Sequence, residues 1–185
     1  MTAKQQWLVV LGIVAMLVGG AFTASHFLKD ELTNVTTGSD APGFAASTVD
    51  AAPQMKSLSN YRGEVVLLNI WATWCGPCRE EMPAIERLHQ ELGAKGLKIV
   101  AVSVDNAGEE QKIRDFVKEF GLHFEVLHDA SGAIQGIYRT TGVPETFIID
   151  REGVVRKRLI GHMDLTQNYD GNKRLLEQLL AQPKS

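Results

Sequence analysis

From residue 44 onward, short apolar runs alternate with stretches in which apolar residues recur every three or four positions. The runs are rich in β-branched residues and predict buried strands at 65–71, 97–104, 124–127, 146–150 and 154–160. The helical spacing predicts helices at 77–92, 109–120 and 133–138, and a final amphipathic helix containing Leu175 and Leu180. Pro83 falls inside the first helix and is expected to kink it. Alternating strands and helices that end in a hairpin and a helix predict an α/β sandwich around a central mixed sheet.

The beginning of the chain has a different pattern. Between Lys4 and Lys29 there is no Asp, Glu, Lys or Arg, and the apolar run 7–28 is long enough to span a bilayer as a helix. We favour an uncleaved membrane anchor at 1–28, with Lys4 on the cytoplasmic side. The alternative is a cleaved signal peptide with 8–18 as its apolar core and the small residues 19–21 as its cleavage site. Both interpretations place the body of the protein outside the cytoplasm.

The segment after the apolar run has a third composition. Residues 29–43 are polar and rich in turn formers, which predicts a flexible tether. Residues 44–185 are then expected to form one domain, because a chain of 185 residues is long enough for a single domain with its own core. We expect this domain to be a monomer.

The composition disfavours two classes of protein. A net charge of -3 gives no general positive potential that would attract nucleic acid, and two cysteines are too few for a disulfide-rich scaffold. A structural zinc site needs four ligands at a recognisable spacing, and the histidines do not provide them. They are His26, His89, His123, His128 and His162. We expect all five to be surface or partly satisfied side chains, and we expect no metal and no cofactor.

Both cysteines lie in W-C-G-P-C-R, which joins the predicted strand 65–71 to the predicted helix 77–92 and includes the first residues of that helix. Free N–H groups and the helix dipole favour a thiolate at a helix N-terminus, so Cys75 suits a nucleophile. Cys78, one turn further, is expected to be less exposed. Pro77 suits a first helical turn, and Gly76 leaves room for a partner backbone near Cys75. The arrangement predicts thiol–disulfide exchange, in which Cys75 attacks a substrate disulfide and Cys78 displaces the reduced product.

Two acidic residues follow the cysteines. Glu81 lies three residues after Cys78, on the same helical face, where a shielded carboxylate can take the proton that Cys78 loses. The alternative is that these acids merely favour the helix dipole, which is the interpretation we prefer for Glu80.

A second group of candidate residues, G-V-P-E-T, lies far away in the sequence, before the predicted strand 146–150. Pro144 is either an ordinary proline at a strand start or a cis proline that faces the cysteines. A cis bond would expose the backbone of Val143 for pairing with a substrate chain. The residues alone leave both alternatives open.

Together these motifs resemble the thioredoxin superfamily, and more narrowly the membrane-tethered TlpA/ResA/CcmG group of extracytoplasmic thiol–disulfide oxidoreductases. The supporting motifs are D-A-P-G-F, L-L-N-I-W-A-T-W-C-G-P-C-R-E-E-M-P, V-A-V-S-V-D and G-V-P-E-T-F-I-I-D-R-E-G, and they span residues 40–163. The resemblance implies a thioredoxin-like three-layer sandwich with a central mixed sheet. The strand near Phe124 and the helix near Ala133 look like an insertion of this group.

The resemblance also implies roles for individual residues. Cys75 is the nucleophile, Cys78 is the resolving thiol and Pro144 is the cis proline. Glu81 matches the acidic residue that these proteins keep near the buried cysteine. A glutamate directly after the proline, here Glu145, resembles the cytochrome c maturation branch of this group.

The aromatic and loop residues of the motifs are expected to contact the substrate. Trp71 is expected beneath the site and Trp74 over the dithiol, and core filling is the alternative for both. The implied substrate-binding residues are Trp74, Gly76, Pro77, Val143, Pro144 and Glu145.

For the whole protein, the resemblance implies a reductant in an oxidising compartment, supplied with electrons by a membrane thiol donor. Its substrates would be the heme-site cysteines of apocytochrome c, or other exported proteins with wrong disulfides. The Gly76-Pro77 dipeptide departs from this group and is typical of cytosolic thioredoxins. The resemblance therefore does not determine the redox potential or the substrate protein.

Three alternatives remain beside this reading. A redoxin-type thiol peroxidase is disfavoured because its cysteine follows P-x-x-x-T-x-x, whereas W-A-T-W precedes Cys75. A copper chaperone would use Cys75, Cys78 and a histidine such as His162, since thiolates suit Cu(I). Copper-handling relatives, however, space their cysteines by three residues and not two. A disulfide oxidase or isomerase with the same dithiol stays open, because direction depends on thiolate stability.

Overall fold

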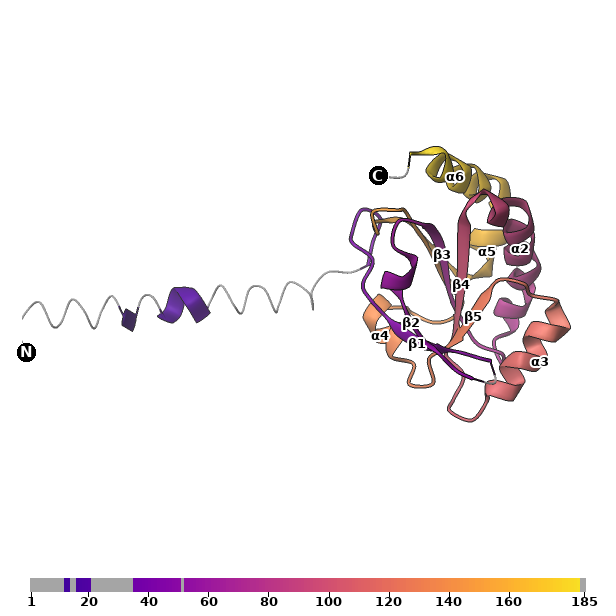
Figure 1. Ribbon diagram of the computed structural model, residues 1–185, viewed down its shortest axis with the longest axis horizontal. Helices are drawn as coiled ribbons and strands as arrows, with labels where there is room; N and C mark the ends of the chain where they lie inside the picture. Colours follow the sequence, from indigo (N-terminus) through magenta and orange to yellow (C-terminus); the bar gives the residue numbers. More distant parts are fainter. Residues whose placement is uncertain (1–11, 14–15, 21–34, 51, 184–185) are drawn as a thin grey trace, which may run out of the picture. The chain divides into compact units, whose positions relative to one another are not determined.

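The computed structural model describes residues 12–13, 16–20, 35–50 and 52–183 (Figure 1). The chain divides into two compact units, Met1–Asn34 and Val35–Ser185. Within the described ranges, no helix has the length and apolar character needed to cross a membrane. The predicted anchor at 1–28 lies outside the described residues except for 12–13 and 16–20, so it stays a prediction.

A mixed sheet forms the centre of the second unit. Its strand order, in the part that the structure describes, is β2-β1-β5-β4-β3-β6-β7. The strands are β1 (Ala45–Thr48), β2 (Met55–Ser57), β3 (Val65–Trp71), β4 (Leu97–Ser103), β5 (Glu125–His128), β6 (Glu145–Ile149) and β7 (Val155–Ile160). Strands β3, β4 and β5 pair in parallel and the other pairs are antiparallel. The predicted α/β architecture with a central mixed sheet is confirmed.

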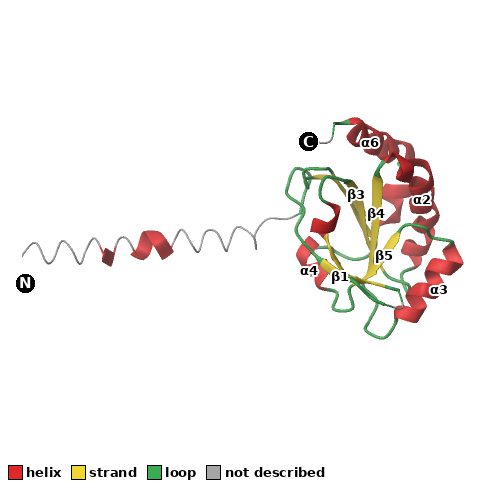
Figure 2. Ribbon diagram, viewed as in Figure 1, coloured by secondary structure: helices red, strands yellow, loops and turns green. Residues whose placement is uncertain are grey.

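Helices cover both faces of this sheet (Figure 2). They are α2 (Gly76–Leu92), α3 (Glu110–Phe120), α4 (Ala133–Tyr138), α5 (Gly161–Thr166) and α6 (Tyr169–Ala181), with short 3-10 turns η1 (Leu58–Tyr61) and η2 (Gly93–Lys95). Alternate side chains of β3 enter two core clusters: Leu67 packs with residues of α2, α3 and α6, while Leu68 packs with residues of α4. Because both faces are covered, β3 reads in the sequence as one continuous apolar run.

Most predicted elements are confirmed with small changes of their ends. Strand β3 and helix α4 have the predicted bounds, and α2 begins at Gly76 and continues through Pro83. The sequence does not predict β1, β2 and α5. Strands β1 and β2 have four and three residues, and only Ala46 among them is buried, so they lack the apolar pattern on which the prediction depends.

The folded unit begins earlier than predicted, because residues 35–43 pack against the β6–β7 hairpin. Val35 is buried, and the N–H groups of Gly38 and Ala41 donate to the carbonyl oxygens of Val155 and Gly153 at 2.7 and 2.8 Å. The predicted tether 29–43 is therefore wrong over its second half. The contacts are mostly backbone hydrogen bonds, which a polar, glycine-containing sequence does not reveal.

Candidate active site

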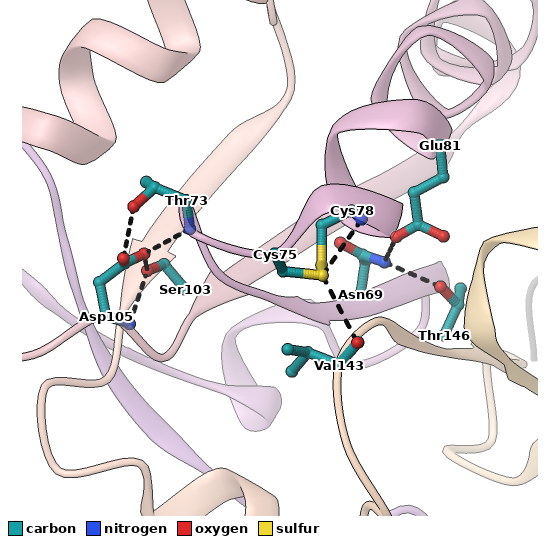
Figure 3. The surroundings of a disulfide bond; sticks show 9 residues. All are labelled: Asn69, Thr73, Cys75, Cys78, Glu81, Ser103, Asp105, Val143 and Thr146. Atoms are coloured by element: carbon teal, nitrogen blue, oxygen red, sulfur yellow. Dashed lines mark hydrogen bonds between the residues drawn. A yellow bond between two sulfur atoms is a disulfide. The ribbon is translucent and has the colours of Figure 1, made fainter.

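The dithiol lies where β3 ends and α2 begins (Figure 3). Cys75 is the N-cap of α2 and forms a disulfide with Cys78, with the Cα atoms 5.2 Å apart. The backbone N–H of Cys78 donates to Sγ of Cys75 at 3.1 Å. Cys75 is 4% exposed and Cys78 is 0% exposed, so Cys75 is the sulfur that a substrate can reach. The helix start favours negative charge on Cys75 once the disulfide opens.

The loop before β6 lies against the nucleophile, although the two are 68 residues apart in the sequence. The peptide bond between Val143 and Pro144 is cis, as the resemblance implies. The carbonyl oxygen of Val143 is 3.4 Å from Sγ of Cys75. The N–H of Gly161, at the start of α5, donates to the carbonyl oxygen of Pro144 at 2.9 Å. The backbone of this loop is thus held next to the disulfide, where a substrate chain would have to lie.

Glu81 is buried one turn beyond Cys78, with 1% of its surface exposed. Nδ2 of Asn69 donates to Oε1 of Glu81 at 2.6 Å and to Oγ1 of Thr146 at 2.9 Å. Oε2 of Glu81 has no hydrogen-bond partner in the described part of the chain. Burial raises the pKa of Glu81 to about 8, against the opposing effect of the bond from Asn69. Glu81 therefore gains and loses its proton near neutral pH, as a general base for Cys78 must.

A second buried carboxylate lies on the opposite side of the cysteines from Glu81 (Figure 3). Asp105 is 0% exposed and accepts three hydrogen bonds. The donors are the N–H of Thr73 at 3.0 Å, the hydroxyl of Thr73 at 2.6 Å and the hydroxyl of Ser103 at 2.6 Å. Thr73 lies in a turn that closes when the N–H of Cys75 donates to the carbonyl oxygen of Ala72 at 3.2 Å. Asp105 thus holds the turn that leads into the nucleophile.

Glu145 follows the cis proline but does not face the solvent. It is 1% exposed. Its Oε1 accepts from the N–H of Thr141 at 2.7 Å, and its Oε2 accepts from Nε of Arg158 at 2.9 Å. Nη2 of Arg158 also donates to the carbonyl oxygen of Arg139 at 2.9 Å. Both carboxylate oxygens are therefore occupied within the chain, and the Glu145–Arg158 pair fixes both ends of the loop 139–145.

Replacement of Arg158 by methionine is expected to lower the free energy of unfolding by about 3 to 5 kcal/mol, because it leaves the buried carboxylate of Glu145 without its partner. The double variant E145Q/R158M is expected to recover part of this loss, because the uncompensated charge is gone. Chemical denaturation followed by tryptophan fluorescence measures both. Equal losses in the single and double variants would contradict the assignment of a buried ion pair.

The residues around the opening of the site are exposed. Trp74 is 67% exposed, so core filling is wrong for this tryptophan. Gly76 and Pro77 are also exposed, and a Cβ added at Gly76 would meet nothing within 4 Å. Trp71 is 0% exposed and its ring packs on Phe116 with centroids 4.6 Å apart. Trp71 therefore belongs to the core beneath the cysteines, and Trp74, Gly76 and Pro77 remain available to a partner.

The histidines are not all at the surface. His128 is 3% exposed, and its Nε2 lies 2.9 Å from the carbonyl oxygen of Asp105. His162 lies with Nε2 3.0 Å from Oε2 of Glu80. His26 lies outside the described residues. In the ranges that are described, no group of three or more His, Cys, Asp or Glu side chains is placed to hold a metal ion.

The sequence assigns no role to four residues that contact the site: Asn69, Thr73, Asp105 and Thr146. Asn69 carries the clearest signal, because it is the polar residue in the otherwise apolar run V-V-L-L-N-I-W. A polar side chain in a strand covered on both faces needs a buried partner. Asp105 follows a strand end, a position typical of site residues in parallel sheets, but its partner Thr73 could not be named without the structure.

Comparison with known proteins agrees with this geometry. A model of the AhpC/TSA family matches residues 37–158. The thiol-disulfide oxidoreductase ResA of Geobacillus thermodenitrificans is 35% identical over 176 residues, which cover 92% of this chain and 98% of that protein. The thioredoxin-like protein YneN of Bacillus subtilis is 37% identical over 162 residues, with 86% and 92% coverage. A structure described as the thiol:disulfide interchange protein DsbE from Chlorobium tepidum matches with a TM-score of 0.66 at 31% identity, covering 80% of this chain and 96% of that one.

Proposed function

The chain belongs to the AhpC/TSA family and is a thiol–disulfide oxidoreductase with a thioredoxin-like fold, and on this premise we propose that it reduces disulfides in proteins outside the cytoplasm. The observation that carries the proposal is the position of Cys75. Its sulfur lies between the carbonyl oxygen of Val143, at 3.4 Å, and the helix that buries Cys78 and Glu81. The backbone at Val143, which can bind a substrate chain, and Glu81, which can accept a proton, thus lie near the same disulfide.

In the first step the thiolate of Cys75 attacks one sulfur of a substrate disulfide. The substrate S–S bond breaks, a bond between Cys75 and the substrate forms, and the second substrate sulfur leaves as a thiolate that takes up a proton. The backbone at Val143 and Pro144 pairs with the substrate chain and orients its disulfide. Trp74, whose exposed side chain precedes Cys75 directly in the sequence, contacts the same substrate chain.

In the second step Cys78 gives its proton to Glu81 and attacks Sγ of Cys75. The mixed disulfide breaks, the Cys75–Cys78 disulfide forms and the remaining substrate sulfur leaves as a thiolate. Two electrons have then passed from the dithiol to the substrate. A membrane thiol donor returns two electrons to the enzyme before the next cycle. No metal or cofactor is needed for this exchange.

The client that we propose is apocytochrome c, whose heme-site cysteines must be reduced before heme is attached. The names of the relatives, ResA and DsbE, support a role as a disulfide-exchange enzyme, and the apolar run 7–28 supports a membrane anchor with the domain on the extracytoplasmic face. Glu145 contributes to binding through the loop that it holds and not through direct contact. We propose that the enzyme acts as a monomer.

The test is the reduction potential of the full chain, equilibrated in glutathione and dithiothreitol buffers and followed by tryptophan fluorescence. A reductant is expected near the value of thioredoxin, roughly -270 mV. A potential near about -120 mV, the range of strong oxidants, would overturn the proposed direction and identify a disulfide-forming enzyme.

The client is tested separately with a peptide that carries an oxidised C-x-x-C-H heme motif. The reduced chain is expected to open this disulfide faster than that of a peptide with the same cysteines and scrambled flanking residues. Equal rates for the two peptides would leave a general reductant and exclude a preference for apocytochrome c.

A further inference from the structure

We propose that Asp105 is a positioning residue that holds the turn before the dithiol, and that the negative charge it fixes there lowers the reduction potential of the Cys75–Cys78 disulfide. The proposal deepens the proposed function, because it names a residue that makes this dithiol a better reductant. It rests on the side-chain cluster of Asp105, Thr73 and Ser103 at the end of β4.

The first step of the argument is the rigid connection between Asp105 and the nucleophile. Oδ2 of Asp105 accepts from the backbone N–H of Thr73 and Oδ1 accepts from the hydroxyl of Thr73, so the carboxylate holds this residue by two hydrogen bonds. A backbone bond runs beside this grip, from the N–H of Val104 to the carbonyl oxygen of Trp71 at 2.9 Å. Only Trp74 separates Thr73 from Cys75, and the turn is closed at Cys75 itself. The carboxylate therefore helps to fix the backbone that leads directly into the nucleophile.

The second step concerns the charge. The carboxylate of Asp105 accepts hydrogen bonds from the N–H of Thr73 and from two hydroxyl groups, and bonds of this kind stabilise a negative charge. Among the described residues Asp105 forms no ion pair: its neighbour His128 binds the carbonyl oxygen of Asp105, and Lys112, which interacts electrostatically with Asp105, forms its ion pair with Glu109. The negative charge is thus stabilised mainly by hydrogen bonds and has no cation in direct contact. Charges inside a protein are also screened less than charges in water.

The third step links this charge to the redox equilibrium. Strong oxidants such as DsbA owe their high potential to a reduced form that is stabilised as a thiolate. A negative charge fixed on the turn that leads into Cys75 has the opposite effect, because it disfavours a second negative charge on the sulfur. The start of α2 stabilises the thiolate of Cys75, and the charge of Asp105 destabilises it. The reduction potential of the dithiol therefore depends on the balance of these two effects.

The decisive variant is Asp105→Asn in the full chain. Asparagine keeps the shape, and its amide can donate to the hydroxyl of Thr73, so the turn retains its anchor while the charge is lost. The equilibrium constant of the dithiol against glutathione is expected to shift about tenfold towards the reduced form, which raises the potential by about 30 mV. The pKa of Cys75, read from the pH dependence of alkylation, is expected to fall. Asp105→Ser repeats the test with a second neutral residue if the asparagine variant does not fold.

Asp129→Asn is the matched control, because Asp129 is also buried after a neighbouring strand but binds Ser131, which precedes α4, and Ile134 in the first turn of α4. It is expected to change stability and to leave the redox equilibrium unchanged. An unchanged equilibrium in Asp105→Asn, or an equal shift in Asp129→Asn, would overturn the proposal. If the wild-type chain fails to reduce protein disulfides but the shift in Asp105→Asn is seen, the proposed function fails and the role of Asp105 stands.

Discussion

Replacement of Cys75 by serine is expected to abolish the reduction of protein disulfides. Cys75 is the sulfur at the start of α2 and next to the cis-proline loop, and a serine hydroxyl at this place is not ionised at neutral pH. Insulin reduction, measured by turbidity with dithiothreitol as the electron source, gives the activity. The variant is expected to show the rate of dithiothreitol alone.

Replacement of Cys78 by serine is expected to have a different result, because the first exchange remains possible and the second does not. The variant should accumulate a covalent complex between Cys75 and the substrate, visible on a non-reducing gel and lost on reduction. A complex that forms equally well in the Cys75→Ser variant would show that the two roles are exchanged.

Replacement of Glu81 by glutamine is expected to slow the resolving step by about 10² to 10⁴-fold, the usual contribution of a general base. In the wild-type enzyme the rate of this step should rise with pH as Glu81 loses its proton, up to its pKa of about 8. The variant should lack this rise. Single-turnover release of the second product from a preformed mixed disulfide measures the step directly.

The same carboxyl group makes stability depend on pH. Its pKa is about 8 in the folded chain and 4.5 for the free side chain, so between these values the folded protein holds a proton that the unfolded chain releases. The contribution of Glu81 to stability is therefore complete below pH 4.5 and is lost as the pH rises to about 8. The loss amounts to at most about 5 kcal/mol. Denaturation of the oxidised protein at several pH values is expected to show it.

Glu80→Gln is the matched control for both measurements. Glu80 is the preceding residue of the same helix, but its side chain is 66% exposed and binds His162. It should leave the resolving rate and the pH dependence of stability near the wild-type values. A loss of rate as large as that of Glu81→Gln would show that general negative charge on α2, and not a buried base, is responsible.

The parts of the fold that could be predicted are those with a strong local pattern. Strand β3 is a run of apolar residues covered on both faces, and its predicted ends are confirmed. The cis bond at Pro144 could be inferred only from the resemblance, because proline before a strand also suits a trans bond. The position of Glu81 beside the buried cysteine follows from helical spacing, since residues three apart share a face.

The rest depends on contacts between distant segments. Glu145 was expected among the substrate-binding residues because it follows the cis proline, but its burial depends on Arg158 from the next strand. The hydrogen bond of Asp105 to Thr73 joins residues 32 apart in the sequence. No local pattern contains such pairs. The short edge strands β1 and β2 owe their existence to pairing with each other and with β5, which the sequence alone does not specify.

Arg158 also contacts the residue at which the chain enters the folded unit. Nη1 of Arg158 donates to the carbonyl oxygen of Val35, the first residue of the folded unit, at 3.3 Å. The same guanidinium holds Glu145 beside the cis proline. The same guanidinium is thus bonded both to the first residue of the folded unit and to the residue after the cis proline, so a displacement of Val35 is transmitted to the loop 139–145 through Arg158 as well as through the backbone bonds of residues 38–41.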